Sequence, residues 1–547
     1  MSPNLSNTCP TCGCLTETTV SAHSRSSRIS ELLRCNDPPS DSELSDFQNV
    51  VKSGPGRIAD LDEKITRANE HLSTLIHERR VLEANIEDAR MLSFPMRRIP
   101  SDVLRAIALE AIPSPYEILN PIQALEDSAN SLDSRESPWT LAQVSHTWRS
   151  TIIDAPEMWS SMSLVIKHNE EPATVARQMF MTGLRLERSK FFPLSISLSS
   201  SPDAYISNHP LLFIISTRSS FIRNLRIQAS LISYKAFSWW RGRLDQLHHL
   251  TLISPAPNAS VSQSSGGVES AIDVFEFAPE LKVVTLRPLI SGDRFELDVR
   301  LPTTQLIHLD LEIFDWKDIE LLRKSRNLKS LHIRYSRKLL LKPQNHKIIS
   351  LPVLTSLTLK YNSTSDWHSS QYPESDPIFS LLFIPDITRL RLVYSRAVTI
   401  LPTILLPNAI TALIIEFTVS HLLKGLQTLL QSVPNLRDLV ILPSLMSPLV
   451  VDAPLLILLL MDIPLHHLRT LDLRGLILEG LMSKRFHCMH EFVEMVEAHR
   501  EGDNGERDQM ETVYLRSPLA LDFNYAQRWK SLIDGGLKVV YGYPELW

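Results

Sequence analysis

The chain has 547 residues, a length that predicts two or more domains because a single hydrophobic core seldom grows that large. Hydrophobic residues make up 43% and charged residues 21%, as in soluble globular proteins. The net charge of −5 shows no basic excess, so no nucleic-acid partner is expected. Glycine is scarce at 16 residues, which argues against enzymes built on glycine-rich phosphate loops or nucleophile elbows.

Cysteine content and hydropathy favour a cytoplasmic or nuclear protein. Five cysteines are too few for a disulfide framework, and the first residues show no secretory signal. The most apolar window, LVVDAPLLILLLMDIPLHHL at 449–468, contains Asp452, Asp462, Pro454 and Pro464. A lipid-spanning helix would resist these residues, so we expect buried repeat elements there and no membrane partner.

Residues 1–56 are rich in Ser, Thr, Asn, Asp and Pro, and we expect them to be mostly disordered. Within them Cys9, Cys12 and Cys14 form the run CPTCGC. A C-x-x-C pair can hold half of a tetrahedral zinc site, but no second pair follows nearby. The sequence therefore favours an unstructured thiol cluster, and we assign no metal and no cofactor.

Residues 57–92 show a heptad pattern, with nine of the ten seam positions apolar between charged flanks. The a positions are Ile58, Ile65, Leu72, Arg79 and Ile86, and the d positions are Leu61, Ala68, Leu75, Leu82 and Ala89. This pattern predicts a long helix of the coiled-coil type. Two interpretations stay open: a homodimer through 57–92, or a single amphipathic helix docked on the next domain.

Residues 94–165 contain two short helical patterns separated by a polar insert at 113–138. The first helix is predicted after Pro95 and Pro100, with one apolar face made of Val103, Leu104, Ile107, Ala108 and Ala111. The second is predicted before Pro156, with one apolar face made of Leu141, Val144, Trp148 and Ile152. Two such helices cannot bury themselves alone and need a third element or a partner.

The order RRIPSDVL followed by LAQVSHTWRSTIIDAPEMWSSM resembles an F-box in the form common among mushroom-type (basidiomycete) fungi. The residues that carry the resemblance are Ile99, Pro100, Val103, Leu104, Ile107, Leu141, Val144, Trp148, Arg149, Pro156 and Trp159. Ser145 stands where the family usually has cysteine, and the insert at 113–138 is a larger departure. The resemblance implies a small trihelical module that docks on the Skp-type adaptor of a cullin ubiquitin ligase.

The candidate site residues follow from this resemblance. An exposed apolar helix start is a common mark of a partner site, so we assign adaptor contacts to Ile99, Pro100, Val103, Leu104, Ile107 and Val144. The core of the module is assigned to Leu141, Trp148, Ile152 and Trp159. The two tryptophans are expected in the core rather than at the adaptor.

From about residue 190 to 547 the pattern L-x-x-L-x-L recurs ten times, at intervals of 22 to 34 residues. The middle anchors are Leu225, Leu250, Val284, Leu309, Leu331, Leu357, Leu390, Leu413, Leu439 and Leu471. These intervals centre on the leucine-rich-repeat period, and stacked units would form a parallel sheet. Only Asn362 fits the asparagine position of regular repeats, so we expect an irregular, leucine-rich-repeat-like solenoid. Pro193–Leu198 and the last twelve residues, GLKVVYGYPELW, are expected to be capping strands.

The residues that follow the anchors should point off the sheet toward a binding partner. They are Arg226, Thr251, Thr285, Asp310, His332, Thr358, Arg391, Ile414, Val440 and Asp472. This set is mixed in charge and suits a protein surface, but we expect most of its members to be solvated and assign none a specific role.

Catalytic signatures are weak. The run from His487 to Glu491 continues to Glu494, where a zinc-protease helix would need its second histidine, so an amphipathic helix is favoured. The expected fold is therefore α/β: a coiled-coil helix, an F-box and a repeat solenoid. The expected function is an F-box substrate adaptor that is not an enzyme and presents an unknown protein substrate to the ligase core. The alternative is a scaffold whose F-box-like part recruits no ligase; a hydrolase with unrecognised motifs is a third option.

Overall fold

The computed structural model describes residues 27–35, 37–119, 130–201, 206, 209–229, 231–254, 271–288, 298–313, 316–336, 348–362, 378, 381–394, 409–417, 423–443, 453–463, 465–474, 486–500, 509–516, 518–519 and 521–542. The chain forms two compact units, Met1–Ile99 and Pro100–Trp547. None of the described helices combines the length and the apolarity that crossing a membrane requires.

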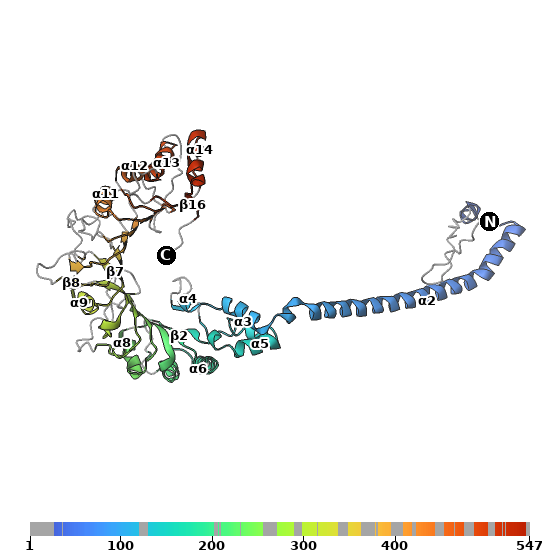
Figure 1. Ribbon diagram of the computed structural model, residues 1–547. Coiled ribbons are helices and arrows are strands. Elements are labelled where there is room, and N and C mark those ends of the chain that lie inside the picture. Colours follow the sequence, from blue (N-terminus) through green and yellow to red (C-terminus); the bar gives the residue numbers. More distant parts are fainter. Residues whose placement is uncertain are drawn as a thin grey trace. The chain divides into compact units, whose positions relative to one another are not determined.

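The first unit is dominated by one long helix. Helix α1 (Ser27–Leu32) precedes helix α2 (Asp41–Ser93), and the short 3-10 helix η1 (Pro95–Arg98) follows it (Figure 1). A capping box starts α2: the Ser40 hydroxyl accepts from the Glu43 amide, and the Glu43 carboxylate accepts from the Ser40 amide at 2.8 Å. The expected disorder of 1–56 is wrong for α1 and from Asp41 onward, where the cap at Ser40 starts α2 ahead of the predicted boundary at 57. Gly54, Pro55 and Gly56 lie inside the helix although they lower helix stability.

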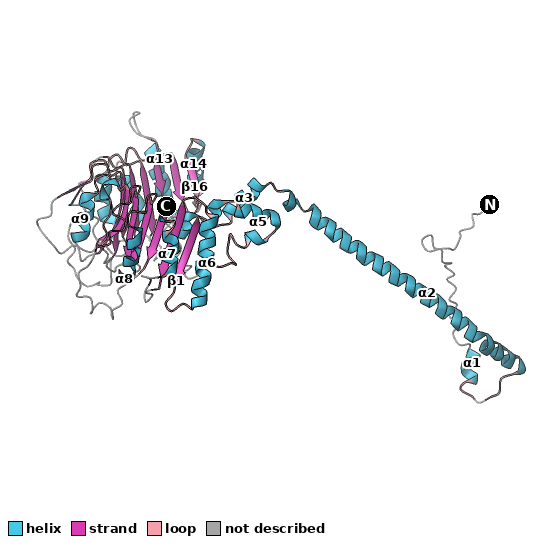
Figure 2. Ribbon diagram, turned by 90° about the horizontal axis from the view of Figure 1, so that it is seen from below, coloured by secondary structure: helices cyan, strands magenta, loops and turns pink. Residues whose placement is uncertain are grey.

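The described residues of the second unit are built on one parallel sheet of fourteen strands, which confirms the predicted α/β class. Figure 2 shows the strands side by side. In sheet order they are β1 (Ser161–Ile166), β2 (Leu194–Ser200), β3 (Ile222–Gln228), β4 (His249–Ser254), β5 (Val283–Pro288), β6 (His308–Ile313), β7 (Ser330–Ser336), β9 (Ser356–Asn362), β11 (Arg389–Tyr394), β12 (Ala412–Phe417), β13 (Asp438–Pro443), β14 (Thr470–Asp472), β15 (Thr512–Leu515) and β16 (Lys538–Tyr541). A second, two-stranded sheet joins β8 (Ile349–Ser350) to β10 (Leu382–Phe383).

The ten predicted anchors form a single row across this sheet. Each anchor pairs in register with the next, from Leu225 opposite Leu250 to Leu439 opposite Leu471. All ten are at most 1% exposed. The apolar residue two positions later in each strand is also buried, so every strand sends alternate side chains into one continuous core.

Helices and turns return the chain from each strand to the next. Figure 1 shows α6, α8, α9, α11, α12 and α13 on the outer side of the arc that the strands follow. The helices are α3 (Ser101–Glu110), α4 (Pro115–Leu119), α5 (His146–Ile153), α6 (Pro172–Arg188), α7 (Pro210–Ser216), α8 (Leu231–Tyr234), α9 (Trp316–Lys324), α11 (Leu423–Gln431), α12 (Ala453–Asp462), α13 (Phe486–Arg500) and α14 (Phe523–Asp534). The 3-10 helices are η3 (Leu141–Gln143), η4 (Pro156–Met158), η5 (Ser219–Phe221), η6 (Lys235–Trp240) and η7 (Thr303–Gln305).

The sheet extends beyond the predicted boundaries of the solenoid. It begins with β1, which overlaps the end of the segment 94–165, whereas the predicted start of the solenoid is residue 190. Strand β2, expected as a cap from Pro193, is therefore the second strand and not the edge. Met162, Leu164 and Ile166 are buried at alternate positions of β1, so a period of two was present in the sequence at this point. Strand β15 was missed in the same way, while β16 is the predicted final strand.

Candidate functional site

The described residues of the segment 100–160, which are 100–119 and 130–160, form a small helical module that packs at the first strand of the sheet. Helix α3 contacts α5, and α5 contacts the 3-10 helix η3 that precedes it. Trp148, Ile152 and Trp159, expected in the core, are all buried. The indole Nε1 of Trp159 donates to the carbonyl oxygen of Ile152 at 2.8 Å, so the buried ring keeps its polar atom paired.

The second helix begins later than predicted. Ser145 caps α5, accepting a hydrogen bond from the Trp148 amide at 3.3 Å. Leu141 and Val144 therefore lie outside the helix, the first half-buried and the second 60% exposed. The predicted single face of Leu141, Val144, Trp148 and Ile152 is wrong, because the chain turns at the cap and leaves Val144 in solvent.

Helix α3 divides its apolar residues between two faces. Leu104 and Ala108, at i and i+4, are at most 2% exposed and lie on the side packed on the module. Pro100, Val103 and Ile107 fall at i, i+3 and i+7 on a neighbouring face that is exposed, with Val103 at 44% and Ile107 at 42%. We call these three residues the module face. Leu104 was assigned to adaptor contacts, but its burial removes it from any surface, while Ile99 is half-buried.

Two residues that the sequence interpretation overlooked complete the module. Trp139 stacks edge-on against Trp159, with ring centroids 4.8 Å apart. Arg185 from α6 lies beside both rings and donates to the carbonyl oxygens of Ser131 and Ser161, each at 2.7 Å. Arg185 is 1% exposed, and this burial lowers the pKa of its guanidinium. Arg185 lies outside the segment 94–165, and nothing in the sequence distinguishes it from other arginines of an amphipathic helix.

The polar insert at 113–138 is tied to the sheet at both described ends. Helix α4 contacts β1, β2 and β3, with Ile118 buried. Ser131 donates its amide to the Ser163 carbonyl at 3.0 Å, and its hydroxyl accepts from the Ser163 amide at 2.8 Å. The insert therefore joins the module to strand β1.

The inner face of the sheet carries a row of mainly polar side chains. These are the residues that follow the anchors, and they pair in register from Arg226 opposite Thr251 to Val440 opposite Asp472. The expectation that they are mostly solvated is wrong for Arg226, Asp310 and Asp472, which are 3% to 4% exposed. Each of these buried charges needs a partner, because desolvating an unpaired ion is costly.

Asp310 is the centre of an ion cluster on this face. Arg334 contacts both of its oxygens, Arg287 forms an ion pair with Oδ2, and the Nδ1 atom of His332 lies 3.5 Å from Oδ2. Burial alone would raise the pKa of the Asp310 carboxyl, but His332, Arg334 and Arg287 outweigh it and hold the pKa well below its usual range. The carboxylate is therefore ionised at neutral pH.

The same cluster contains groups that a bound partner could contact. Burial lowers the pKa of His332, although the neighbouring Asp310 carboxylate opposes this effect. Its buried Nε2 atom has no hydrogen-bond partner among the described residues. Arg287 keeps 41% of its side chain exposed. A buried nitrogen without a partner and a partly exposed guanidinium can both bind an incoming polar group.

Further polar contacts flank the cluster on both sides. Arg391 donates to Glu416 at 3.1 Å across β11 and β12. Near the start of the sheet Asn224 donates to the Ser195 hydroxyl at 2.8 Å, and its carbonyl oxygen lies 2.8 Å from Nδ1 of His249. Burial, with His248 alongside, lowers the pKa of His249 to about 4. These side chains bridge neighbouring strands and keep the face rigid.

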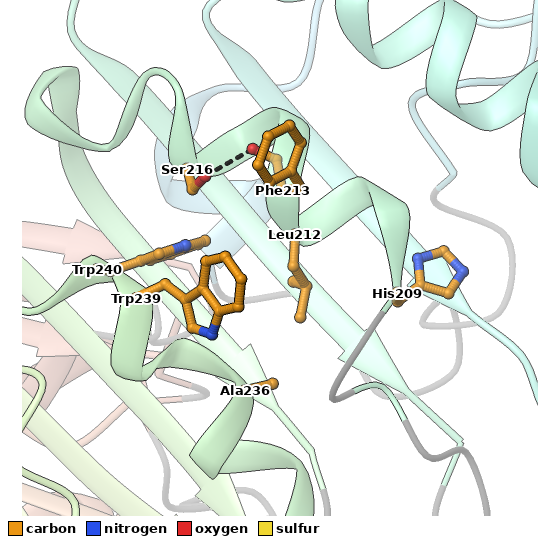
Figure 3. Close-up of a pocket in the computed structure, with 7 residues that line it drawn as sticks. All are labelled: His209, Leu212, Phe213, Ser216, Ala236, Trp239 and Trp240. Atoms are coloured by element: carbon orange, nitrogen blue, oxygen red, sulfur yellow. Dashed lines mark hydrogen bonds between the residues drawn. The ribbon is translucent and has the colours of Figure 1, made fainter.

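A pocket of about 240 Å³ opens on the outer side, between α7 and η6 (Figure 3). Its lining is His209, Leu212, Phe213, Ser216, Ala236, Trp239 and Trp240. The Ser216 hydroxyl donates to the Phe213 carbonyl at 2.6 Å, and burial lowers the pKa of His209. The pocket can hold an apolar side chain, but it brings no activated nucleophile together with a base.

No group of three or more potential metal ligands occurs among the residues that the structure describes. Cys9, Cys12 and Cys14 lie outside those residues, so the zinc alternative stays untested. Residues 487–491 fall in helix α13, where His490 stacks on Tyr525 with ring centroids 3.8 Å apart and lies 3.2 Å from Asp522. This histidine has a packing role between α13 and α14.

Comparison with known proteins adds no family assignment. No protein-family model matches the chain, and no curated protein matches it significantly.

Proposed function

We propose that this chain is a non-catalytic substrate adaptor: the helical module binds a Skp-type adaptor of a cullin ubiquitin ligase, and the inner face of the sheet binds a protein substrate. The single observation that carries the proposal is the division of α3, which buries Leu104 and Ala108 while leaving Val103 and Ile107 exposed. Apolar side chains exposed on one helix face are a common feature of partner sites.

The inner face suits a polar protein surface. Around Asp310 it combines a partly exposed Arg287 with the unpaired Nε2 of His332. An adaptor would then act by proximity, because holding the substrate near the ligase raises the effective concentration of its lysines at the conjugating enzyme. Such a protein would work in the cytoplasm or the nucleus.

The test is co-purification of the full chain with a fungal Skp-type adaptor. Ile107→Asp places a charge on the module face, and Leu109→Asp is the matched control, since Leu109 is 40% exposed on the opposite side of the same helix. We expect the unchanged chain and the control to capture the adaptor and Ile107→Asp to lose it. Equal capture by both variants would exclude the module face as the site.

The scaffold alternative is supported by a different observation. Ser131 pairs with Ser163, and Arg185 links the module to β1 through the carbonyl of Ser161. In this alternative the module acts as a terminal cap on the first strand of the sheet, and repeat proteins need such caps for solubility. If the folded, unchanged chain captures no adaptor, this capping role is the better account of the module.

A further inference from the structure

The long helix α2 presents an apolar seam that nothing in its own unit buries. No residue of α2 is buried. Nine large apolar side chains at a and d positions are between 44% and 73% exposed: Leu44, Val51, Ile58, Leu61, Ile65, Leu72, Leu75, Leu82 and Ile86. A helix of 53 residues gains little from propensity alone and normally depends on packing of its apolar face.

The structure lengthens the seam beyond the heptads visible at 57–92. Because α2 begins at Asp41, the same phase continues upstream through Leu44, Phe47 and Val51, with Gly54 at the next d position. The a and d positions thus keep one phase from Leu44 to Ala89. Most of the large apolar residues of α2 lie at a and d positions, and Val50 at g and Ile76 at e flank this seam. A seam centred on a and d positions over this length is the geometry of a two-stranded coiled coil, whereas a helix docked on a globular domain usually shows a broader apolar face.

Charges beside the seam favour a second copy of this chain as the occupant, in parallel and in register. In that arrangement each g residue faces the e residue five positions later in the partner. Arg57 at g then faces Asp62 at e, twice in each dimer. Both copies of this pair bring opposite charges together. Glu78 at g and Glu83 at e form a like-charged pair, and each of the remaining g–e pairs along α2 contains an uncharged residue.

Arg79 is the one charged residue at an a position, and its neighbours suit the same arrangement. Within the chain its Nε lies 2.9 Å from Glu83, at an e position. In a parallel pair Arg79 would also lie beside Glu78, at g, of the other copy. Each arginine would then be flanked by two carboxylates. Its positive charge would also offset the repulsion between Glu78 of one copy and Glu83 of the other. A single pair of polar residues at an a position fixes the register of the two helices and lowers the stability of the coiled coil.

We propose that α2 forms a parallel, in-register coiled-coil dimer with a second copy of this chain. A dimer would present two modules and two inner faces in one particle. This inference does not depend on the proposed ligase role, and its test uses no adaptor.

The first measurement is the molar mass of the full chain by sedimentation velocity over a range of concentrations. The seam variant is Ile65→Asp with Leu72→Asp, and the matched control is Thr66→Asp with Ser73→Asp, which adds the same charge one residue away at b positions. We expect dimers for the unchanged chain and the control. The dissociation constant of the seam variant should be at least about 100-fold higher. Burying one apolar side chain lowers the dissociation constant by more than about tenfold, and the variant removes two such side chains from each copy.

Two further variants test orientation and register. In a chain whose five native cysteines are replaced by serine, Leu75→Cys places cysteines opposite each other at d only in a parallel, in-register pair. It should give a reducible covalent dimer that the cysteine-free chain cannot give. Arg79→Ile should tighten dimerisation, because it removes the polar layer. A monomeric unchanged chain would overturn the proposal, as would a dimer that survives in the seam variant. A dimer without the Leu75→Cys cross-link would overturn the parallel arrangement.

Discussion

Arg334 reaches diagonally from β7 to Asp310 on β6, with its Nη2 atom 2.6 Å from Oδ1 and 2.7 Å from Oδ2. The residues directly opposite each other in the ladder are His332 and Asp310. The cluster thus spans three adjacent strands, since Arg287 contributes from β5 on the other side of β6. The cluster locks the middle of the inner face through charge pairing instead of apolar packing.

Replacing Asp310 by asparagine should destabilise the second unit by about 3–5 kcal/mol, because Arg334 would keep a buried charge without its carboxylate. The folded pKa of Asp310 lies below the unfolded value of roughly 3.9. Its contribution is therefore present above that value and is lost as the pH falls toward the folded pKa. Urea unfolding of Asp310→Asn and of the exposed control Asp245→Asn checks this. Equal stability of the two variants would contradict the role of the cluster.

His249 should make stability sensitive to mild acid. Its pKa is about 4 in the folded chain and about 6.5 when unperturbed, so the unfolded chain binds more protons between these values. Stability should therefore fall as the pH decreases from 6.5 to 4. His249→Asn, which can still donate toward Asn224, should show a shallower decrease than the parent. The exposed control His168→Asn should follow the parent curve; a variant His249→Asn with the parent slope would count against the assignment.

Trp159→Phe should destabilise the module by about 1–3 kcal/mol, because the buried Ile152 carbonyl loses its donor. Trp239→Phe is the matched control, since its side chain is 68% exposed. Thermal unfolding compares the two variants. A similar loss in both would indicate that the indole bond contributes nothing beyond ring volume.

Arg185→Met should lower the free energy of unfolding by about 1–3 kcal/mol, because the carbonyls of Ser131 and Ser161 would both lose a charged hydrogen-bond donor. Arg177→Met lies on the same helix in an exposed position and should be nearly neutral. Hydrogen exchange adds a local readout. The Ser163 amide, bonded to the Ser131 hydroxyl, should exchange faster in Arg185→Met only, and unchanged exchange would argue against the link between insert and strand.

The sequence alone was sufficient to predict that the ten anchors form one buried row. A leucine at the centre of each L-x-x-L-x-L unit, with apolar residues at alternate positions, can be buried only if the strands stack in register. Leu225 and Leu471 therefore lie in one row although 246 positions separate them. The same reasoning located Trp148, Ile152 and Trp159 in the interior, because large aromatic and branched side chains are expensive to leave in water.

Only the tertiary structure decided which polar residues are buried and which apolar residues are exposed. Asp310 has no local signal that distinguishes it from Thr285 or Thr358 in the same row; its burial depends on cations supplied by neighbouring strands. Leu104 and Ile107 are similar apolar residues on one short helix, yet the packing of α5 buries the first and leaves the second in solvent. Periodicity determines which residues share a face, whereas contacts between distant segments determine whether that face is covered.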